Sequence, residues 1–348
     1  MKPSTLLVGV SMINLVSFPG FATAATPELL PGTGTHIDYV GDDFEDPQWK
    51  FIANSPKSSK TNDGRTRTPL GYSANRRWAE GPKRGYPDVL KVIPTPKGGL
   101  PESEHSLLMR TLHSGVPGGG SRQLEQDDLI IDCSSRLGTA IRPSELPNCI
   151  VRVYLPPREQ WEDRSGPHFG IRMGLSTKRR EEKQGLFGLR GGQLTTEPYW
   201  PGFWIHFRSE TSPNVEADSA FLKVRADHRG RDFHVMELEE FGWWTFGMSI
   251  TSDGAIHYYA SPGVDELAAE HHITSQRPYS FRATQFRTFF FNICNRDGGS
   301  WSTPFVIDDP QVYVVKSNRV ESIVQQKRTK KRTSTARRQR SSSRSRGR

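Results

Sequence analysis

The chain has 348 residues, a formal net charge of +9 and 3 cysteines. This length is enough to bury a full hydrophobic core in one large domain. The positive charge is concentrated at the C-terminal end, because residues 325–348 contain eleven Lys or Arg and no acidic residue. Without these eleven, the chain has 36 basic and 38 acidic residues. The body is therefore close to neutral, and 3 cysteines allow at most one disulfide.

The first residues have the features of an export signal. Lys2 precedes a mainly apolar run from Leu6 to Val16, and Ala22-Thr23-Ala24 supplies the small-x-small pattern of a signal-peptidase site. The run is too short to span a bilayer comfortably, which disfavours the alternative of an uncleaved membrane anchor. We predict a signal peptide in residues 1–24, no later membrane span, and a secreted or cell-envelope (periplasmic) location.

Residues 25–104 are expected to contribute a leader, a first edge strand and a long loop region packed on the main domain. The stretch from residue 54 to 104 is rich in Gly, Pro, Ser and Lys, with few apolar runs apart from Val89–Ile93. Four carboxylates crowd into five positions just before it: Asp42, Asp43, Glu45 and Asp46.

From His105 onward, short apolar runs alternate with turn signals. About a dozen strands with regular turns predict an all-β fold, a jelly-roll-like antiparallel β-sandwich over residues 105–316. The only helical turn expected lies at 264–272. The strand candidates are 106–112, 128–133, 149–156, 168–175, 202–209, 220–226, 233–238, 287–294 and 304–316, with a hairpin in Phe241–Gly263.

The hairpin is the most regular part of the chain. Asp253-Gly254 separates its two apolar runs, and an Asp-Gly pair in that position is a strong hairpin signal. Alternation assigns one side of the hairpin to the core and leaves His257 and Tyr259 on the other side. The residues predicted to face the core are Trp244, Phe246, Met248, Ile250, Ile256 and Tyr258.

This hairpin and the final strands also carry a resemblance. The pattern Trp-x-x-x-Gly-Met-Ser-Ile-Thr, an Asp-Gly turn and Ile-x-Tyr-Tyr-Ala-Ser-x-Gly, with Ile-Asp-Asp-Pro-Gln-Val at 307–312, resembles the concanavalin A-like (laminin G and lectin/glucanase) superfamily. The resemblance covers about residues 140–316. It implies two curved antiparallel sheets and one concave face, which commonly binds saccharides in such proteins.

Three strands place apolar side chains on one side and His, Arg or aromatic side chains on the other. Sugar rings stack on Trp or Tyr, and Arg and His donate hydrogen bonds to hydroxyls and carboxylates. If these strands are neighbours, they form one cationic, aromatic surface for a polysaccharide; ordinary solvent-facing residues are the alternative. The predicted binding residues are His168, Arg172, Trp204, His206, Arg208, His257 and Tyr259.

Catalytic patterns are weaker than this binding pattern. Laminarinase-type hydrolases of the superfamily carry Glu-x-Asp-x-x-Glu, and the nearest match, in residues 237–240, lacks the middle Asp. The sequence contains no zinc-ligand spacing, phosphate-binding loop or nucleophile elbow. A polysaccharide lyase needs a base beside cations that neutralise a uronate. The candidates for that role are His206, Tyr259, Arg208 and Arg172.

Two further interactions are expected within the fold. First and last strands of a sandwich often meet, so the carboxylates near both ends could hold a structural Ca²⁺, with charged strand ends and no ion as the alternative. Cys133 and Cys149 could form a disulfide if their strands are neighbours, with three buried thiols as the alternative and Cys294 in the core. The candidate calcium ligands are Asp42, Asp43, Glu45, Asp308 and Asp309.

Three functions stay open at this point. The first is an exported, non-enzymatic protein that binds a polysaccharide or a cell-surface polymer. Its tail in residues 317–348, predicted to be disordered, would add adhesion to polyanions. The second function is a polysaccharide lyase, and the third is a structural cell-envelope protein that binds a protein partner.

Overall fold

The computed structural model describes residues 29–54, 56–112, 125–184, 190–296 and 302–330. The predicted signal peptide in residues 1–24 and the part of the tail from residue 331 onward lie outside these ranges. Within the described ranges, no helix is long and apolar enough to cross a membrane.

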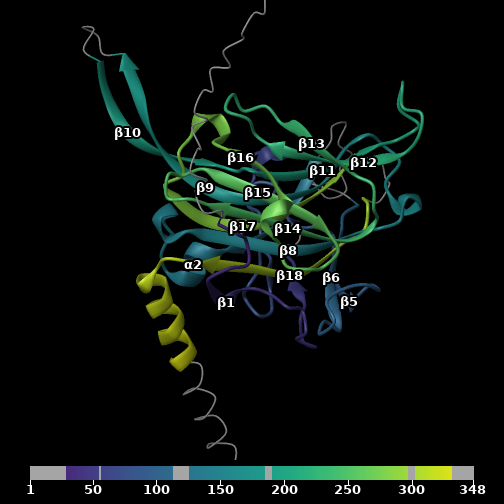
Figure 1. The fold of residues 1–348 in the computed structure, drawn as a ribbon, viewed down its shortest axis with the longest axis horizontal. Helices are drawn as coiled ribbons and strands as arrows, with labels where there is room; N and C mark the ends of the chain where they lie inside the picture. The colour runs from purple at the N-terminus through teal and green to yellow at the C-terminus, as the bar shows by residue number, and fades with distance from the viewer. Residues whose placement is uncertain (1–28, 55, 113–124, 185–189, 297–301, 331–348) are drawn as a thin grey trace, which may run out of the picture.

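The described strands form two antiparallel sheets packed face to face, which confirms the predicted all-β sandwich (Figure 1). The larger sheet has ten strands and the smaller sheet has eight. In spatial order, the larger sheet contains β13 (Phe233–Leu238), β12 (Ser219–Arg225), β11 (Gly202–Arg208), β9 (Gly166–Gln184), β17 (Gln285–Asn295), β7 (Glu125–Asp132), β4 (Ala79–Glu80), β3 (Tyr72–Ser73) and β2 (Phe51–Ile52), with β10 (Arg190–Tyr199) on β9.

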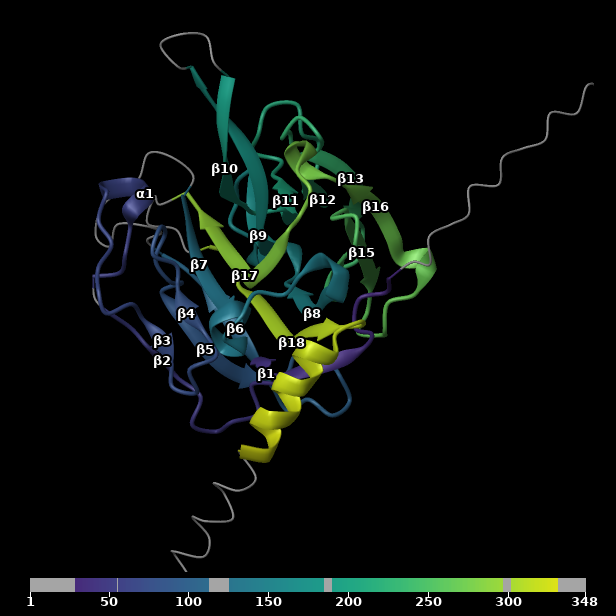
Figure 2. The same ribbon diagram turned by 90° about the vertical axis from the view of Figure 1, so that its left-hand side faces the viewer.

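The smaller sheet contains the predicted hairpin at one end. Its spatial order is β16 (His272–Gln276), β15 (Ile256–Pro262), β14 (Gly242–Ile250), β8 (Pro147–Leu155), β18 (Phe305–Val314), β6 (His105–Arg110) and β5 (Val89–Pro94), with β1 (Thr35–Gly41) on β18. The short helices are α1 (Lys60–Asp63), α2 (Cys133–Leu137) and the 3₁₀ turns Pro143–Glu145, Arg158–Gln160, Ala269–His271 and Pro278–Ser280. The β9–β10 arm and the helix of residues 318–330 project at opposite ends (Figure 2).

The hydrophobic core lies between the two sheets. Phe203 of the larger sheet packs on Phe246 of the smaller sheet, with ring centroids 5.6 Å apart. Phe169 of the larger sheet stacks on Phe305 of the smaller sheet, with ring centroids 4.7 Å apart. The core face predicted for the hairpin is confirmed, because Trp244, Phe246, Met248, Ile250, Ile256 and Tyr258 all belong to this core.

The predicted disulfide is wrong, because the structure gives Cys133 and Cys149 as free, buried thiols. Cys133 begins α2 directly after β7 of the larger sheet, whereas Cys149 lies in β8 of the smaller sheet. The two cysteines therefore belong to opposite layers and not to neighbouring strands. Burial raises the pKa of each thiol, which keeps it in the neutral form.

The region before residue 105 is part of the sandwich and not a loop laid over it. Strands β1 and β5 extend the smaller sheet, and β2, β3 and β4 extend the larger one. Three of these strands have only two residues, so they are too short for alternation to identify. They are defined instead by their backbone hydrogen bonds to neighbouring strands at the edge of the larger sheet.

The start of the predicted disordered tail is helical. Ser317 Oγ accepts the backbone N–H of Val320 at 3.0 Å, which caps a helix over residues 318–330. Val320 and Val324, four positions apart, pack into the core. Arg319 donates to both oxygens of the Glu145 carboxylate, at 2.8 and 2.6 Å. The expectation of disorder is therefore wrong for residues 318–330.

A buried lysine fastens the N-terminal region to the larger sheet. Lys57 Nζ lies 2.6 Å from Asp127 Oδ2 and 2.9 Å from Asp88 Oδ1, and the side chains of Lys57 and Asp127 are 1% and 0% exposed. Burial by itself would lower the pKa of Lys57. The two carboxylates raise it by more than burial lowers it, so the net shift is upward. Burial raises the pKa of Asp127 to about 7 in spite of Lys57.

We expect Lys57→Met to destabilise the protein by about 3–5 kcal/mol at pH 8, because it removes the ammonium that neutralises the charge of buried Asp127. The loss should be smaller at pH 5, where Asp127 takes up a proton and no longer needs a cation. Urea unfolding at the two pH values measures both effects, with the exposed Lys60→Met as control. An equal loss at pH 5 and pH 8 would contradict this account.

Candidate functional site

The residues predicted to form one surface lie on two different sheets. Strands β9 and β11 are neighbours in the larger sheet, but β15, which carries His257 and Tyr259, belongs to the smaller sheet. The outer faces of the two sheets point away from each other. The predicted surface therefore does not include His257 or Tyr259.

The outer side of β14 and β15 is covered by other parts of the chain. A Cβ atom at Gly247 would lie 2.5 Å from side-chain atoms of both Pro31 and Leu267, so the two segments press against this strand. Tyr259 is fully buried in a small apolar cluster with Ile150 and Leu267. Alternation assigned Tyr259 correctly to the outer side, but this second layer removes it from solvent.

His168 is also a buried residue and not a surface ligand. Its two ring nitrogens lie 2.6 Å from Thr303 Oγ1 and 3.1 Å from the carbonyl oxygen of Arg164. Its ring packs against Trp161 with centroids 5.3 Å apart. Burial lowers the pKa of His168 well below its ordinary value, so the ring is neutral. The prediction that His168 takes part in the binding surface is wrong.

The remaining predicted residues lie on the outer face of the larger sheet. Register places Gly170 of β9 between Asn292 of β17 and Trp204 of β11. A Cβ atom at Gly170 would lie 2.7 Å from Asn292 Oδ1 and 2.8 Å from Trp204 Cζ3, so only glycine permits this approach. One cross-strand row contains Asp128, Asn292, Gly170, Trp204, Lys223 and His234, and the next contains Phe290, Arg172, Gly202 and Arg225.

Arg172 is at the centre of this face. Its guanidinium carbon lies 5.2 Å from the centroid of Trp204 and 5.4 Å from that of Phe290. Its Nε and Nη2 atoms both donate to the carbonyl oxygen of Trp200, at 3.1 and 2.6 Å. Burial and the nearby Arg225 lower its pKa to about 9, while Asp128 opposes the shift. A buried arginine is thus held between aromatic rings without a carboxylate in direct contact among the described residues.

A second group of side chains continues the face along β11 and β12. His206 packs on Phe221 at 5.1 Å between ring centroids, and the Arg208 guanidinium lies 3.9 Å above the same Phe221 ring. Burial, then Lys223, lowers the pKa of His206 to about 3. Arg208 makes a bidentate ion pair with Glu237 at 2.7 and 2.9 Å. Glu237 is therefore a partner of Arg208 and, at 2.8 Å, of His234.

Sequence reasoning missed several residues of this face. Lys223 and Arg225 lie on the outer side of β12, where alternation along residues 220–226 could have identified them. Arg84 and Lys83 reach the face from the N-terminal region: Arg84 lies 3.9 Å from Asp128, and Lys83 lies 4.3 Å above the Trp200 ring. No local pattern could have placed these two, because their position depends on the edge strands.

The carboxylates predicted to bind calcium do not form one set of free ligands. Asp42 Oδ2 accepts hydrogen bonds from the indoles of Trp49 and Trp78, at 3.0 and 2.9 Å. Glu45 Oε1 accepts the backbone N–H groups of residues 104 and 105, and its Oε2 lies 3.0 Å from His105 Nδ1. Both side chains are thus engaged within the protein. Glu45 also lies beside Glu104 and His105, and one potential ligand atom from each of these three side chains lies within 4.8 Å of the others.

Asp308 has a different environment. It is 1% exposed, and neither carboxylate oxygen has a hydrogen bond of ordinary geometry among the described residues, although Ser103 is close enough to lower its pKa. Burial is the main cause that raises the pKa of Asp308 to about 7, and the negative charges of Asp309 and Glu45 add to it. Asp43 in turn raises the pKa of Asp309. The carboxylates from the two chain ends do meet, and calcium binding stays a prediction.

The fold and this face define a two-sheet antiparallel β-sandwich with a cationic, aromatic outer face. No known protein family matches the sequence. A search of curated proteins also found no match. The resemblance to the concanavalin A-like superfamily therefore stays a prediction.

Solved structures of other β-rich proteins resemble the chain at low identity. A carbohydrate esterase from the Shiga toxin-encoding bacteriophage phi24B is 10% identical, with 75% of this chain and 97% of that chain covered and a TM-score of 0.37. An alginate lyase from Pseudomonas aeruginosa is 12% identical over 65% and 86% of the two chains, with a TM-score of 0.35. The CBM2 module of the Lactobacillus casei BL23 phage J-1 evolved Dit protein is 8% identical over 81% and 96%, with a TM-score of 0.32. At such values, the activities of those proteins are not carried over to this chain.

We expect Asp308→Asn to stabilise the protein at pH 8 in calcium-free buffer by roughly 2–4 kcal/mol. The folded protein binds the Asp308 proton more tightly than the unfolded chain, so this carboxyl lowers stability as the pH rises from about 4 to about 7. Removing the charge should therefore help at pH 8 and have little effect at pH 4. Thermal unfolding measures the difference, with Asp265→Asn, at an exposed position outside this carboxylate cluster, as control.

Calcium provides the second half of this test. If the predicted ion binds, calcium should raise the melting temperature of the wild type and not that of Asp308→Asn. Equal melting of the wild type in calcium and in chelator would contradict the calcium prediction.

Proposed function

We propose that this protein is an exported, non-catalytic polysaccharide-binding protein that uses the outer face of the larger sheet to bind an acidic polysaccharide. The observation that supports this most directly is the position of Arg172 between Trp204 and Phe290, with Lys223 and Arg225 alongside. Arg172, Trp204 and Phe290 are buried, so they would form the floor of the face. Lys223 and Arg225 are partly exposed, and their ammonium and guanidinium groups would pair with the carboxylates of the ligand.

The charge of this face supports an anionic ligand rather than a neutral one. Among the described residues, Arg225 has a single, distant carboxylate partner, with Asp232 Oδ2 3.9 Å from its Nη1. No carboxylate pairs with Lys223 among the described residues. An acidic polymer would supply the missing countercharges, and partial burial would strengthen each contact.

Binding is favoured over lyase chemistry by the state of the candidate bases. His206 has a pKa of about 3, and so weak a base removes a proton poorly at neutral pH. Tyr259 lies buried in the other sheet and cannot act beside Arg208 or Arg172. Arg208 already pairs with Glu237. Neither of the two predicted bases, His206 and Tyr259, is therefore suited to proton abstraction on this face.

The basic tail belongs to the same proposal. Its Lys and Arg residues would add electrostatic adhesion to polyanions, with little selectivity and a steep dependence on salt. The sandwich would supply the selectivity for the polymer, and the tail would increase the time that the protein stays bound near a charged surface.

We expect the double variant Lys223→Ala/Arg225→Ala to bind an acidic polysaccharide such as alginate or polygalacturonate about 10- to 100-fold more weakly. Each charge-assisted contact contributes roughly 1.5 kcal/mol, and both side chains are partly exposed, so their loss should leave the fold intact. Affinity electrophoresis against acidic and neutral polysaccharides measures the change.

The matched control is Lys91→Ala/Lys316→Ala. It removes two exposed cations, one in β5 of the smaller sheet and one just after β18 of the same sheet. Equal weakening in both double variants would indicate general charge attraction and contradict a specific face. A lyase would be detected by the ultraviolet absorbance of unsaturated uronates, which this proposal expects not to appear.

A further inference from the structure

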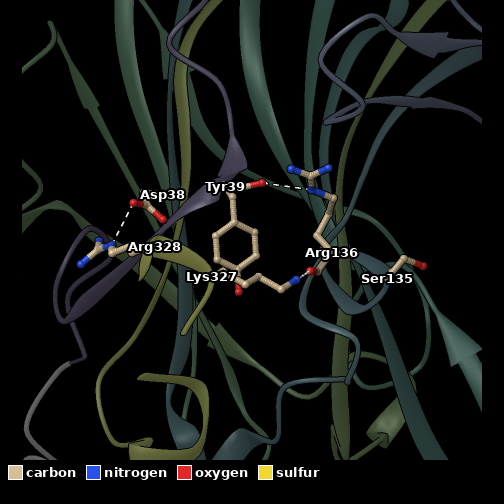
Figure 3. A pocket seen from close by; sticks show the side chains of 6 residues that line it. All are labelled: Asp38, Tyr39, Ser135, Arg136, Lys327 and Arg328. Carbon is tan, nitrogen blue, oxygen red and sulfur yellow. Dashed lines mark hydrogen bonds and ion pairs between the residues drawn. The ribbon is translucent and has the colours of Figure 1, made fainter. Parts of the chain in front are cut away.

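A second cationic site lies at the end of the sandwich, away from the outer face of the larger sheet. The pocket has a volume of about 310 Å³ and lies where β1, α2 and the helix of residues 318–330 meet (Figure 3). Elements from three distant parts of the chain build it. Its lining residues are Asp38, Tyr39, Ser135, Arg136, Lys327 and Arg328.

The charges of this pocket are unbalanced. Arg328 Nε lies 2.9 Å from Asp38 Oδ2, and Asp38 is the only acidic residue among the described residues that line the pocket. Arg136 and Lys327 contact no carboxylate among the described residues. Three cations therefore face one anion, which leaves a net positive charge in the pocket.

The two unpaired cations are held in place by backbone carbonyl groups. Arg136 donates from Nε to the carbonyl oxygen of Tyr39 at 3.1 Å and from Nη1 to that of Arg76 at 3.0 Å. Lys327 Nζ donates to the carbonyl oxygen of Arg136, and it lies 4.6 Å from the centroid of the Tyr39 ring. Figure 3 shows this ring between Arg328 on one side and Arg136 on the other.

This arrangement leaves donors available for a ligand. A guanidinium has five N–H donors and an ammonium three, and Arg136 and Lys327 use two and one of these on backbone oxygens. Their proximity also carries an electrostatic cost: burial and Arg77 lower the pKa of Arg136, and burial and Arg136 lower that of Lys327. An anion in the pocket would remove this repulsion.

We propose that the pocket binds a phosphate or sulfate group, free or as an ester on a larger ligand. A tetrahedral oxyanion presents several acceptor oxygens at once, and the guanidinium and ammonium groups that line the pocket are the donors that pair with such oxygens. The bound group would also fasten the helix of residues 318–330 to β1 and α2, because Lys327 and Arg328 belong to that helix. This site is independent of the polysaccharide face, which lies on other strands.

Calorimetric titration of the full chain with inorganic phosphate, inorganic sulfate and glucose 6-phosphate tests the proposal at constant ionic strength. We expect saturable binding of at least one of the two inorganic anions, and the tighter anion identifies the preferred group. Binding of glucose 6-phosphate as tightly as phosphate would indicate that the pocket accepts esters.

The variants locate the site. Lys327→Gln should weaken binding about tenfold or more, whereas Lys91→Gln, the same change at an exposed strand position, should have no effect. Asp38→Asn should bind several-fold more tightly, because it removes the only competing anion and frees Arg328. A gain of this kind cannot arise from misfolding.

Every variant keeps the basic tail, so background binding by the tail is common to all of them. Two results would overturn the proposal. One is wild-type affinity in both Lys327→Gln and Asp38→Asn, and the other is equal weakening in Lys327→Gln and Lys91→Gln.

Discussion

The register of β9 between β11 and β17 is the constraint on which both sides of the larger sheet depend. On the inner side, it directs Phe169 and Ile171 into the core. On the outer side, it sets Gly170 beneath the Trp204 indole and brings Arg172 between Trp204 and Phe290. A shift of one residue would exchange these two sets, exposing the apolar residues and burying the cation in the core. Core packing and the candidate binding face are thus consequences of the same pairing.

The two sheets differ in what covers their outer faces. Residues 29–34 and the segment after β15 lie over the smaller sheet, where Pro31 and Leu267 press on Gly247. On the larger sheet, the N-terminal region contributes Lys83 and Arg84 to the face, where Lys83 lies above the Trp200 ring and Arg84 lies near Asp128. The same region is anchored by Lys57 on buried Asp127. One long N-terminal segment therefore closes one face and adds charge to the other.

Alternation located part of the candidate site because it reports which side of a strand a residue occupies. Trp204, His206, Arg208 and Arg172 all lie on the outer side that alternation assigned to them. The same rule misplaced His168, where the pairing of β9 with β11 is irregular and the ring turns toward Trp161. It also could not identify which sheet a strand joins, so Tyr259 was grouped with residues that lie on the opposite layer.

The sequence by itself determined the all-β class, the central hairpin and its core face, because period-two patterns and the Asp253-Gly254 turn are local features. Only the tertiary structure decided the order of the strands, the two-residue edge strands, the free thiols and the docking of the helix at residues 318–330. These depend on contacts between residues far apart in the chain, such as Arg319 with Glu145 and Lys57 with Asp127. Pairing partners across such distances are selected by packing and charge in three dimensions, which no local pattern records.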